Sequence, residues 1–255
     1  MSLPKKILFD IQDGIARITL NRPEKRNALD AGLISELKQA MAETAGDPAC
    51  RVVLLTGAGK DFCSGADLAG LEKIAQAGVI ENMDDARNMA ELFLAMRNHP
   101  RPIVAAVQGR ALAGGCGLAT ACDIVLAAES AQFGYPEVNI GFVAAMVMAI
   151  VRRSVSEKAA FELVVGGEAV PAARAYEIGL IHRVYPGDVF AREVDAYAAR
   201  LAGKSAAAVM LSKRLLYQMD SMSFEAALEA GVQVNGIARM TEDYRRGIER
   251  FLKKT

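Results

Sequence analysis

The chain has 255 residues, of which 52% are apolar and 24% charged, which is enough for a sizeable core in one large domain or in a domain with a helical appendage. Thirty basic residues balance thirty acidic ones, and this zero net charge argues against a nucleic-acid-binding protein or one held to an anionic membrane. No apolar run approaches a membrane span and the N-terminus lacks the apolar core of a signal peptide, so we expect a soluble, cytoplasmic protein.

The first part of the chain predicts a β-hairpin, a polar loop and a helix. Strand-forming residues at 7–12 and 15–20 flank Asp13-Gly14, a pair that favours a tight hairpin turn. The loop at 21–29 is basic, and its charges taken alone are no more than solvated surface groups. Asp30 then caps a helix whose apolar residues recur on one face until Gly46-Asp47-Pro48.

Short apolar strands alternate with helices in the next part of the chain. Residues 52–55 and 103–107 predict buried strands, and the stretch 67–98 between them is helical with an interruption near Gly78. This alternation indicates repeated ββα-like units and therefore an α/β fold.

A glycine cluster at 114–117 follows the strand 103–107 and precedes an apolar helix start. Glycine allows sharp turns and close approach of a ligand, so the pattern predicts free backbone N–H groups at this turn. Such donors hold a phosphate or a carbonyl oxygen that becomes negative in a transition state. The segment lacks the GK[ST] ending of a P-loop, which disfavours phosphate. Tight helix–sheet packing is the alternative explanation.

A second loop of small residues, 61–68, also follows an apolar strand. Two such loops can direct one N–H apiece at the same oxygen. We therefore expect this loop and the glycine cluster to form one site, with Glu137 as a candidate carboxylate. Taken alone, Glu137 is better explained as a solvent-facing residue that follows Pro136.

The cysteines and histidines do not indicate a metal or redox centre. The cysteines lack CxxC spacing and the chain has only two histidines, so we expect no metal ligands. Cys63 and Cys116 fall inside the two loops, but no histidine is placed to activate either thiol. We interpret both as small, buried filler beside a ligand.

Helical patterns dominate the rest of the chain. Residues 142–151 are almost wholly apolar but too few to cross a bilayer, so we predict a buried helix beside the site. Strands cease near Asp188, where we place a domain boundary. Further helices are predicted over 158–165, 172–178, 190–201, 206–219 and 224–252.

These motifs resemble the enoyl-CoA hydratase/isomerase, or crotonase, superfamily over nearly the whole chain and in the expected order. The resemblance rests on NRPEKRNAL at 21–29, SGADL at 64–68, ALAGGCGLATACDIV at 111–125, AQFGYPEVNIG at 131–141 and AYEIGLIHRV at 175–184. It implies a crotonase-like spiral of ββα units over residues 1–187, which would hold the CoA-thioester site. It also implies that the helical region 188–255 assembles homotrimers or dimers of trimers.

The resemblance implies roles for particular residues. The N–H groups of Ala66 and Gly114 would form an oxyanion hole for the carbonyl of an acyl-CoA thioester, and Glu137 would be the catalytic carboxylate. Coenzyme A would enter as part of the substrate, with no permanently bound cofactor. The residues implied to contact coenzyme A are Lys25, Arg26, Ala28, Ser64, Ala66, Asp67, Leu68 and Lys254.

One departure from the family pattern bears on the reaction. Hydratases of this family usually place a second glutamate just after the GGC, where this chain has Gly117. Hydration of a 2-enoyl-CoA is the first expectation because it is the commoner activity in the family. Isomerisation of a 3-enoyl-CoA to the 2-enoyl-CoA by Glu137 alone follows closely. A non-catalytic acyl-CoA-binding scaffold is the alternative from another class.

Overall fold

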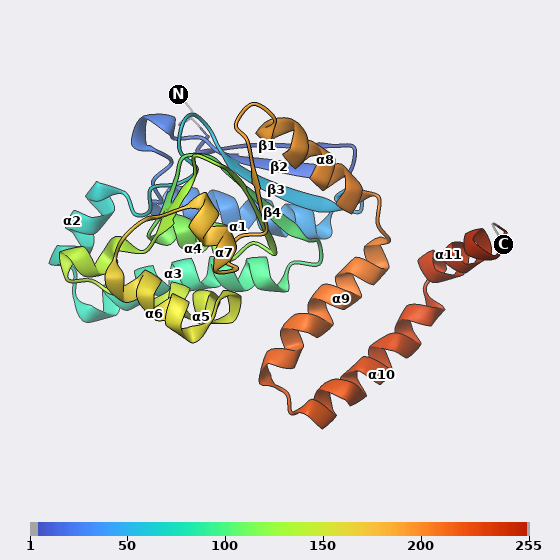
Figure 1. The fold of residues 1–255 in the computed structure, drawn as a ribbon. Helices are drawn as coiled ribbons and strands as arrows, with labels where there is room; N and C mark the ends of the chain where they lie inside the picture. Colours follow the sequence, from blue (N-terminus) through green and yellow to red (C-terminus); the bar gives the residue numbers. More distant parts are fainter. Residues whose placement is uncertain (1–4, 254–255) are drawn as a thin grey trace.

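A six-stranded sheet forms the centre of the molecule in the computed structural model, which describes residues 5–253 (Figure 1). The strand order is β1-β2-β3-β4-β6-β9. The first two strands pair antiparallel as the predicted hairpin, and the other neighbours pair parallel. The bounds are β1 (Ile7–Gln12), β2 (Ile15–Leu20), β3 (Val52–Gly57), β4 (Ile103–Val107), β6 (Ile124–Ala128) and β9 (Arg183–Tyr185).

A smaller sheet lies at the ends of these strands and carries the candidate site. It contains β5 (Arg110–Leu112), β7 (Gln132–Gly134) and β8 (Val170–Pro171) in the order β5-β7-β8. The β5–β7 pair is parallel and places Leu112 opposite Gly134. The strand that precedes the predicted glycine cluster therefore lies next to the strand that precedes Glu137.

Helices cover both faces of the large sheet because β4 and the first four residues of β3 are continuously apolar and need burial on both sides. One face packs against α1 (Ala31–Gly46), which begins at the predicted cap, where the Asp30 carboxylate accepts from the Leu33 N–H. The other face packs against α8 (Phe190–Ala202), which buries Val194 and Ala198 in a second core.

The remaining helices follow the predicted pattern in most places. They are α2 (Leu68–Gln76), α3 (Val79–Asn98), α4 (Gly114–Thr120), α5 (Ala145–Ser154), α6 (Glu157–Gly166), α7 (Ala172–Glu177), α9 (Ala206–Gln218), α10 (Phe224–Met240) and α11 (Glu242–Leu252). Short 3-10 turns are η1 (Pro23–Lys25), η2 (Pro136–Ile140) and η3 (Met219–Ser221). The predicted interruption at Gly78 separates α2 from α3.

Two predicted helices have different bounds in the structure. The buried helix expected at 142–151 starts only at Ala145, and Phe142 and Val143 before it are exposed. The single helix expected over 224–252 is broken at Thr241, whose hydroxyl accepts from the Tyr244 N–H and starts a new helix.

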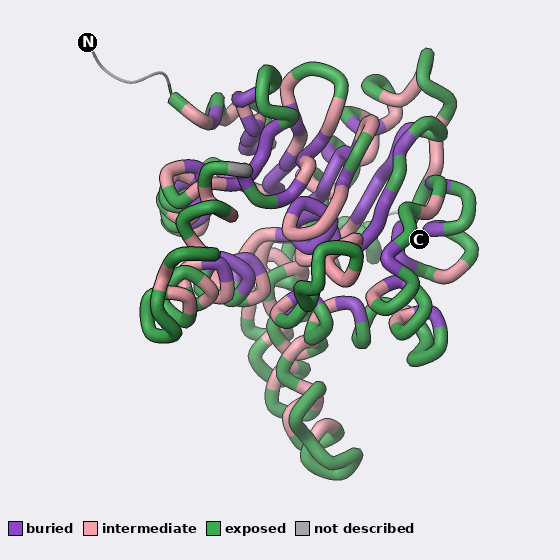
Figure 2. The backbone as a smooth tube through the Cα atoms, turned by 90° about the vertical axis from the view of Figure 1, so that its left-hand side faces the viewer, coloured by how far each residue is buried: buried purple, intermediate pink, exposed green. Residues whose placement is uncertain are grey.

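The C-terminal helices leave the body as an arm (Figure 1). Buried Lys213 on α9 anchors this arm, because its ammonium lies 2.8 Å from the Asp123 carboxylate and 3.1 Å from the Met96 carbonyl. No residue of α10 or α11 is buried in the described chain, and Figure 2 shows exposed colouring along the projecting helices. None of the described helices is long and apolar enough to span a membrane.

The strands end at Tyr185, just before the predicted boundary near Asp188. Helix α8 nevertheless returns to the sheet, so part of the C-terminal region contributes to the core. The division into residues 1–187 and 188–255 stays a prediction.

Candidate active site

The two predicted loops lie side by side. The Cys63 N–H donates to the Arg110 carbonyl at 3.0 Å, and the Leu112 N–H donates back to the Cys63 carbonyl at 3.0 Å. A Cβ built on Gly65 would lie 3.6 Å from the Gly114 nitrogen, so the loops meet where the two N–H groups were expected. The close approach requires glycine at position 65, which also has a φ of +94°.

The N–H groups of Ala66 and Gly114 have no hydrogen-bond acceptor within the part of the chain that the structure describes. The peptides on either side of Ala66 bond to Leu29, whose N–H donates to the Gly65 carbonyl and whose carbonyl accepts from the Asp67 N–H. Gly114 is the first residue of α4, where an N–H has no partner within the helix. Neither N–H donates a hydrogen bond to any described residue. Two adjacent backbone donors are thus available to a ligand.

Ala113 holds the Gly114 peptide in a conformation that favours glycine, with φ of +50° and ψ of −130°. Two hydrogen bonds fix it, since its N–H donates to the Gly134 carbonyl at 2.8 Å and its carbonyl accepts from the Gly117 N–H at 3.0 Å. A non-glycine residue here costs on the order of 1–3 kcal/mol. The surrounding fold therefore stabilises a strained backbone beside the Gly114 donor.

The Glu137 carboxyl group is partly buried and lacks a counter-charge. The residue lies in η2, and its Oε2 atom is buried with no hydrogen-bond partner among the described residues. Burial raises the pKa of Glu137 above its usual value. A carboxyl group in this environment exchanges a proton near neutral pH more readily than a solvated one.

Position 117 has no room for a side chain. A Cβ built on Gly117 would lie 2.3 Å from Val147 Cγ1 and 3.3 Å from Phe93 Cζ. The first distance is far shorter than any real contact between carbon atoms. The place at which family hydratases were expected to carry a second glutamate is thus occupied by apolar side chains from α5 and α3.

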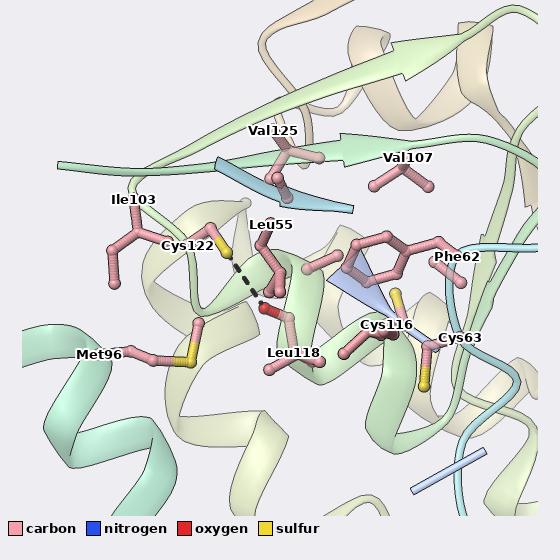
Figure 3. Packing of buried hydrophobic residues seen from close by; sticks show 14 of the residues in the cluster. Leu55, Phe62, Cys63, Met96, Ile103, Val107, Cys116, Leu118, Cys122 and Val125 are labelled. Atoms are coloured by element: carbon pink, nitrogen blue, oxygen red, sulfur yellow. Dashed lines mark hydrogen bonds between the residues drawn. The ribbon is translucent and has the colours of Figure 1, made fainter. Parts of the chain in front are cut away.

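Apolar side chains also lie beside the Gly114 donor. A Cβ at that position would be 3.4 Å from Leu29 Cδ1 and 3.8 Å from Met89 Cε. Within these two segments, Cys63 and Cys116 are neighbours next to Phe62 (Figure 3). Both are buried, as the sequence interpretation expected, and burial raises the pKa of both thiols to about 12, so both are neutral.

A comparison with protein families identifies the family to which this site belongs. Residues 10–255 match the model of the family described as enoyl-CoA hydratase/isomerase. The chain belongs to this family. It is 41% identical to a Thermus thermophilus protein named "Putative enoyl-CoA hydratase", over 94% of this chain and 95% of that one. It is 32% identical to the 2,3-dehydroadipyl-CoA hydratase of Escherichia coli, over 98% and 96% of the two chains.

Solved structures agree with the family assignment. The crystal structure of an enoyl-CoA hydratase from Mycobacterium smegmatis superposes with a TM-score of 0.94 at 31% identity, over 98% of this chain and 96% of that one. The α/β crotonase fold expected from the sequence motifs is confirmed.

Sequence reasoning missed an ionic cluster in this member of the enoyl-CoA hydratase/isomerase family. The Arg22 guanidinium lies 2.6 Å from the Asp67 carboxylate and 3.1 Å from that of Asp30, and it donates to the Ala28 carbonyl. The Arg22 and Asp67 side chains are both almost fully buried. Hydrogen bonding from Arg22 lowers the pKa of Asp67 to about 2. The cluster joins the basic loop to the residues that follow the Ala66 donor.

The residues implied to contact coenzyme A lie in or beside the two segments that this ionic cluster joins. Lys254 is the exception, because it lies outside the described residues. Lys25 is half exposed and lies 3.2 Å from the Asp67 carboxylate. Arg26 is exposed, and its carbonyl accepts from the Ser64 N–H. Ala28 is buried, and Leu68 begins α2. Their contacts with coenzyme A stay predictions.

Proposed function

We propose that this protein transfers protons on the acyl chain of an enoyl-CoA thioester, with Glu137 as the only acid–base carboxylate. The observation that carries the proposal is the combination of two N–H donors, on Ala66 and Gly114, with the partly buried Glu137 carboxyl group. Within residues 5–253, neither donor has an acceptor and the carboxyl group has no cationic partner. Coenzyme A enters as part of the substrate.

The two donors act on the thioester oxygen. When a proton leaves the carbon next to the carbonyl, negative charge develops on this oxygen as the enolate forms. A preorganised donor at such a position typically contributes about 3–4 kcal/mol to the transition state. Because the donors have no protein acceptor, the developing charge does not compete with an existing hydrogen bond.

Glu137 moves the proton. As a carboxylate it takes a proton from the acyl chain, and burial, which raises its pKa, makes it a stronger base than a solvated glutamate. The acid then returns that proton elsewhere on the same dienolate. The enzyme therefore ends each cycle in its starting state.

Among the reactions of the family, isomerisation is favoured by the packing at Gly117. Glu137 takes a proton from C2 of a 3-enoyl-CoA, the double bond shifts, and the same proton returns at C4 to give the 2-enoyl-CoA. This reaction needs one carboxylate and no water. Val147 and Phe93 fill the place of a second carboxylate, which is compatible with this single-base chemistry.

Hydration of a 2-enoyl-CoA is the second candidate, because the Escherichia coli relative is named as a hydratase. Here Glu137 would accept a proton from the attacking water at C3 and C2 would receive a proton. With no second carboxylate to orient the water, we expect a slower reaction than isomerisation.

The test compares wild type with Glu137→Gln on crotonyl-CoA and on a 3-enoyl-CoA, with exposed Glu129→Gln as the matched control. We expect the wild type and the control to form the 2-enoyl-CoA, and Glu137→Gln to lose at least a hundredfold in kcat. Glu137-dependent formation of 3-hydroxyacyl-CoA as the main product would replace isomerisation by hydration. Binding without turnover in all three proteins would favour the non-catalytic scaffold.

A further inference from the structure

The side chain of Tyr135 is fully buried and lies between the Glu137 turn and helix α4, which carries the Gly114 donor. It follows β7 and directly precedes η2, two residues before Glu137. It is among the largest side chains with almost no exposed surface. A phenol hydroxyl in such a place needs hydrogen-bond partners.

The hydroxyl finds such a partner on α4. Tyr135 Oη lies 3.0 Å from Thr120 Oγ1. The Thr120 hydroxyl has one proton, which it donates to the Cys116 carbonyl at 2.9 Å. The Tyr135 hydroxyl is therefore the donor to Thr120.

The Tyr135 phenol and the Cys116 thiol, which is also buried, both remain neutral. Burial raises the pKa of the Cys116 thiol to about 12 and that of the Tyr135 phenol well above its ordinary value. The negative charge of Glu137 raises both pKa values further. This hydrogen-bond network brings no positive charge to the site, so it leaves Glu137 without a counter-ion.

The network links the segment that carries the Glu137 carboxyl group to helix α4, which carries the Gly114 N–H donor. On the α4 side, the Thr120 hydroxyl bonds to the carbonyl of Cys116, two residues after the Gly114 donor; on the other side, Tyr135 lies two residues before Glu137. The backbone contact from Ala113 to Gly134 lies on the same path. A shift of η2 relative to α4 would therefore change the separation between the carboxyl group and the N–H donor.

We propose that Tyr135 is a positioning residue, whose hydroxyl holds the Glu137 turn in register with the oxyanion helix α4. This inference rests on the proposed function, in which Glu137 and the Gly114 N–H act on one substrate. Tyr135 itself touches neither the thioester oxygen nor the transferred proton.

The test removes the hydroxyl and keeps the ring, with Tyr135→Phe. We expect kcat to fall by at least about tenfold, because small misplacements of reacting groups are costly. The KM for the enoyl-CoA should change by less than about twofold, because the proposed coenzyme A contacts lie elsewhere. Tyr185→Phe, a partly buried tyrosine packed in the second core, is the matched control and should leave both constants unchanged.

A second variant addresses the same bond from the α4 side. Thr120→Val removes the acceptor, and we expect a similar loss in kcat. The double variant should lose no more than either single one, because the two residues act through one contact. Circular dichroism and the unfolding temperature check that each protein is folded, and Thr120→Val carries the test if Tyr135→Phe does not fold.

Three results would count against the proposal. A folded Tyr135→Phe enzyme with wild-type kcat would show that the hydroxyl only fills the core. A rise in KM with unchanged kcat would show a role in binding. Additive losses in the double variant would show that the two side chains do not act through their mutual bond. A fully active Glu137→Gln enzyme would instead overturn the proposed function, and the positioning role with it.

Discussion

Val147 occupies the space that a side chain at Gly117 would need, with its Cγ1 only 2.3 Å from the Cβ that such a side chain would add. Helices α4 and α5 approach each other here because residue 117 is glycine. Val147 is itself buried. The identity of residue 117 and that of residue 147 are consequently coupled, and a change at one position requires a change at the other.

This coupling predicts the outcome of adding a second carboxylate. Gly117→Glu alone should lower the free energy of unfolding by about 3 kcal/mol or more, since it overfills a tight contact and buries a charge. Adding Val147→Ala should restore part of the stability and raise the yield of 3-hydroxyacyl-CoA from crotonyl-CoA. Chemical denaturation and product analysis measure both effects, with Val147→Ala alone as the control. A Gly117→Glu protein as stable as the wild type would contradict the coupling.

The strained backbone at Ala113 predicts a stabilising substitution. Ala113→Gly relieves about 1–3 kcal/mol of strain but adds flexibility to the unfolded chain, so we expect a net gain of about 1 kcal/mol. The matched control is Ala121→Gly at the other end of α4, where φ is −74° and glycine should destabilise by about 0.5–1 kcal/mol. Equal losses at both positions would show that Ala113 is not strained.

Much of the fold could be predicted because it depends on local patterns. The hairpin turn at Asp13-Gly14, the apolar strands and the break at Gly78 all have signals within a few residues. The break at Thr241 had such a signal too, a capping residue followed by Glu242 and Asp243, but the apolar pattern across it favoured one helix.

The parts of the site that sequence reasoning missed depend on distant contacts. Arg22 meets Asp67 across 45 positions, and nothing in its neighbourhood distinguishes it from a solvated arginine. The contact of Val147 with Gly117 exists only once α5 packs on α4. Ala66 and Gly114 were placed through resemblance to a family, and their catalytic roles stay predictions.

Asp67 predicts a pH dependence of stability. Its folded pKa of about 2 lies below the ordinary value of 3.8, so its stabilising contribution is present above about pH 4 and is lost as pH falls toward 2. Asp67→Asn should therefore cost on the order of 1–2 kcal/mol at pH 7, and the difference from wild type should shrink below pH 4. Urea unfolding across this range measures it, with exposed Asp10→Asn as the control. A difference that stays constant with pH would rule out the ion pair as its cause.

The exposed apolar face of α10 predicts self-association. Leu228 and Val232 lie one turn apart and are 57% and 65% exposed. We expect the purified chain to form trimers or dimers of trimers, and Leu228→Glu with Val232→Glu to shift it toward monomer. Sedimentation velocity distinguishes these species, with Gln233→Glu, which adds one negative charge at an exposed polar position of the same helix, as the control. A wild-type monomer at micromolar concentration would contradict this prediction.

The four buried cysteines provide internal reporters of motion. Cys63 and Cys116 belong to the two segments that carry the N–H donors, whereas Cys50 lies two residues before β3 and Cys122 follows α4. A thiol reagent reaches each one only when its surroundings open. Alkylation rates followed residue by residue, without any introduced label, would therefore separate local opening of the donor loops from unfolding of the whole sheet.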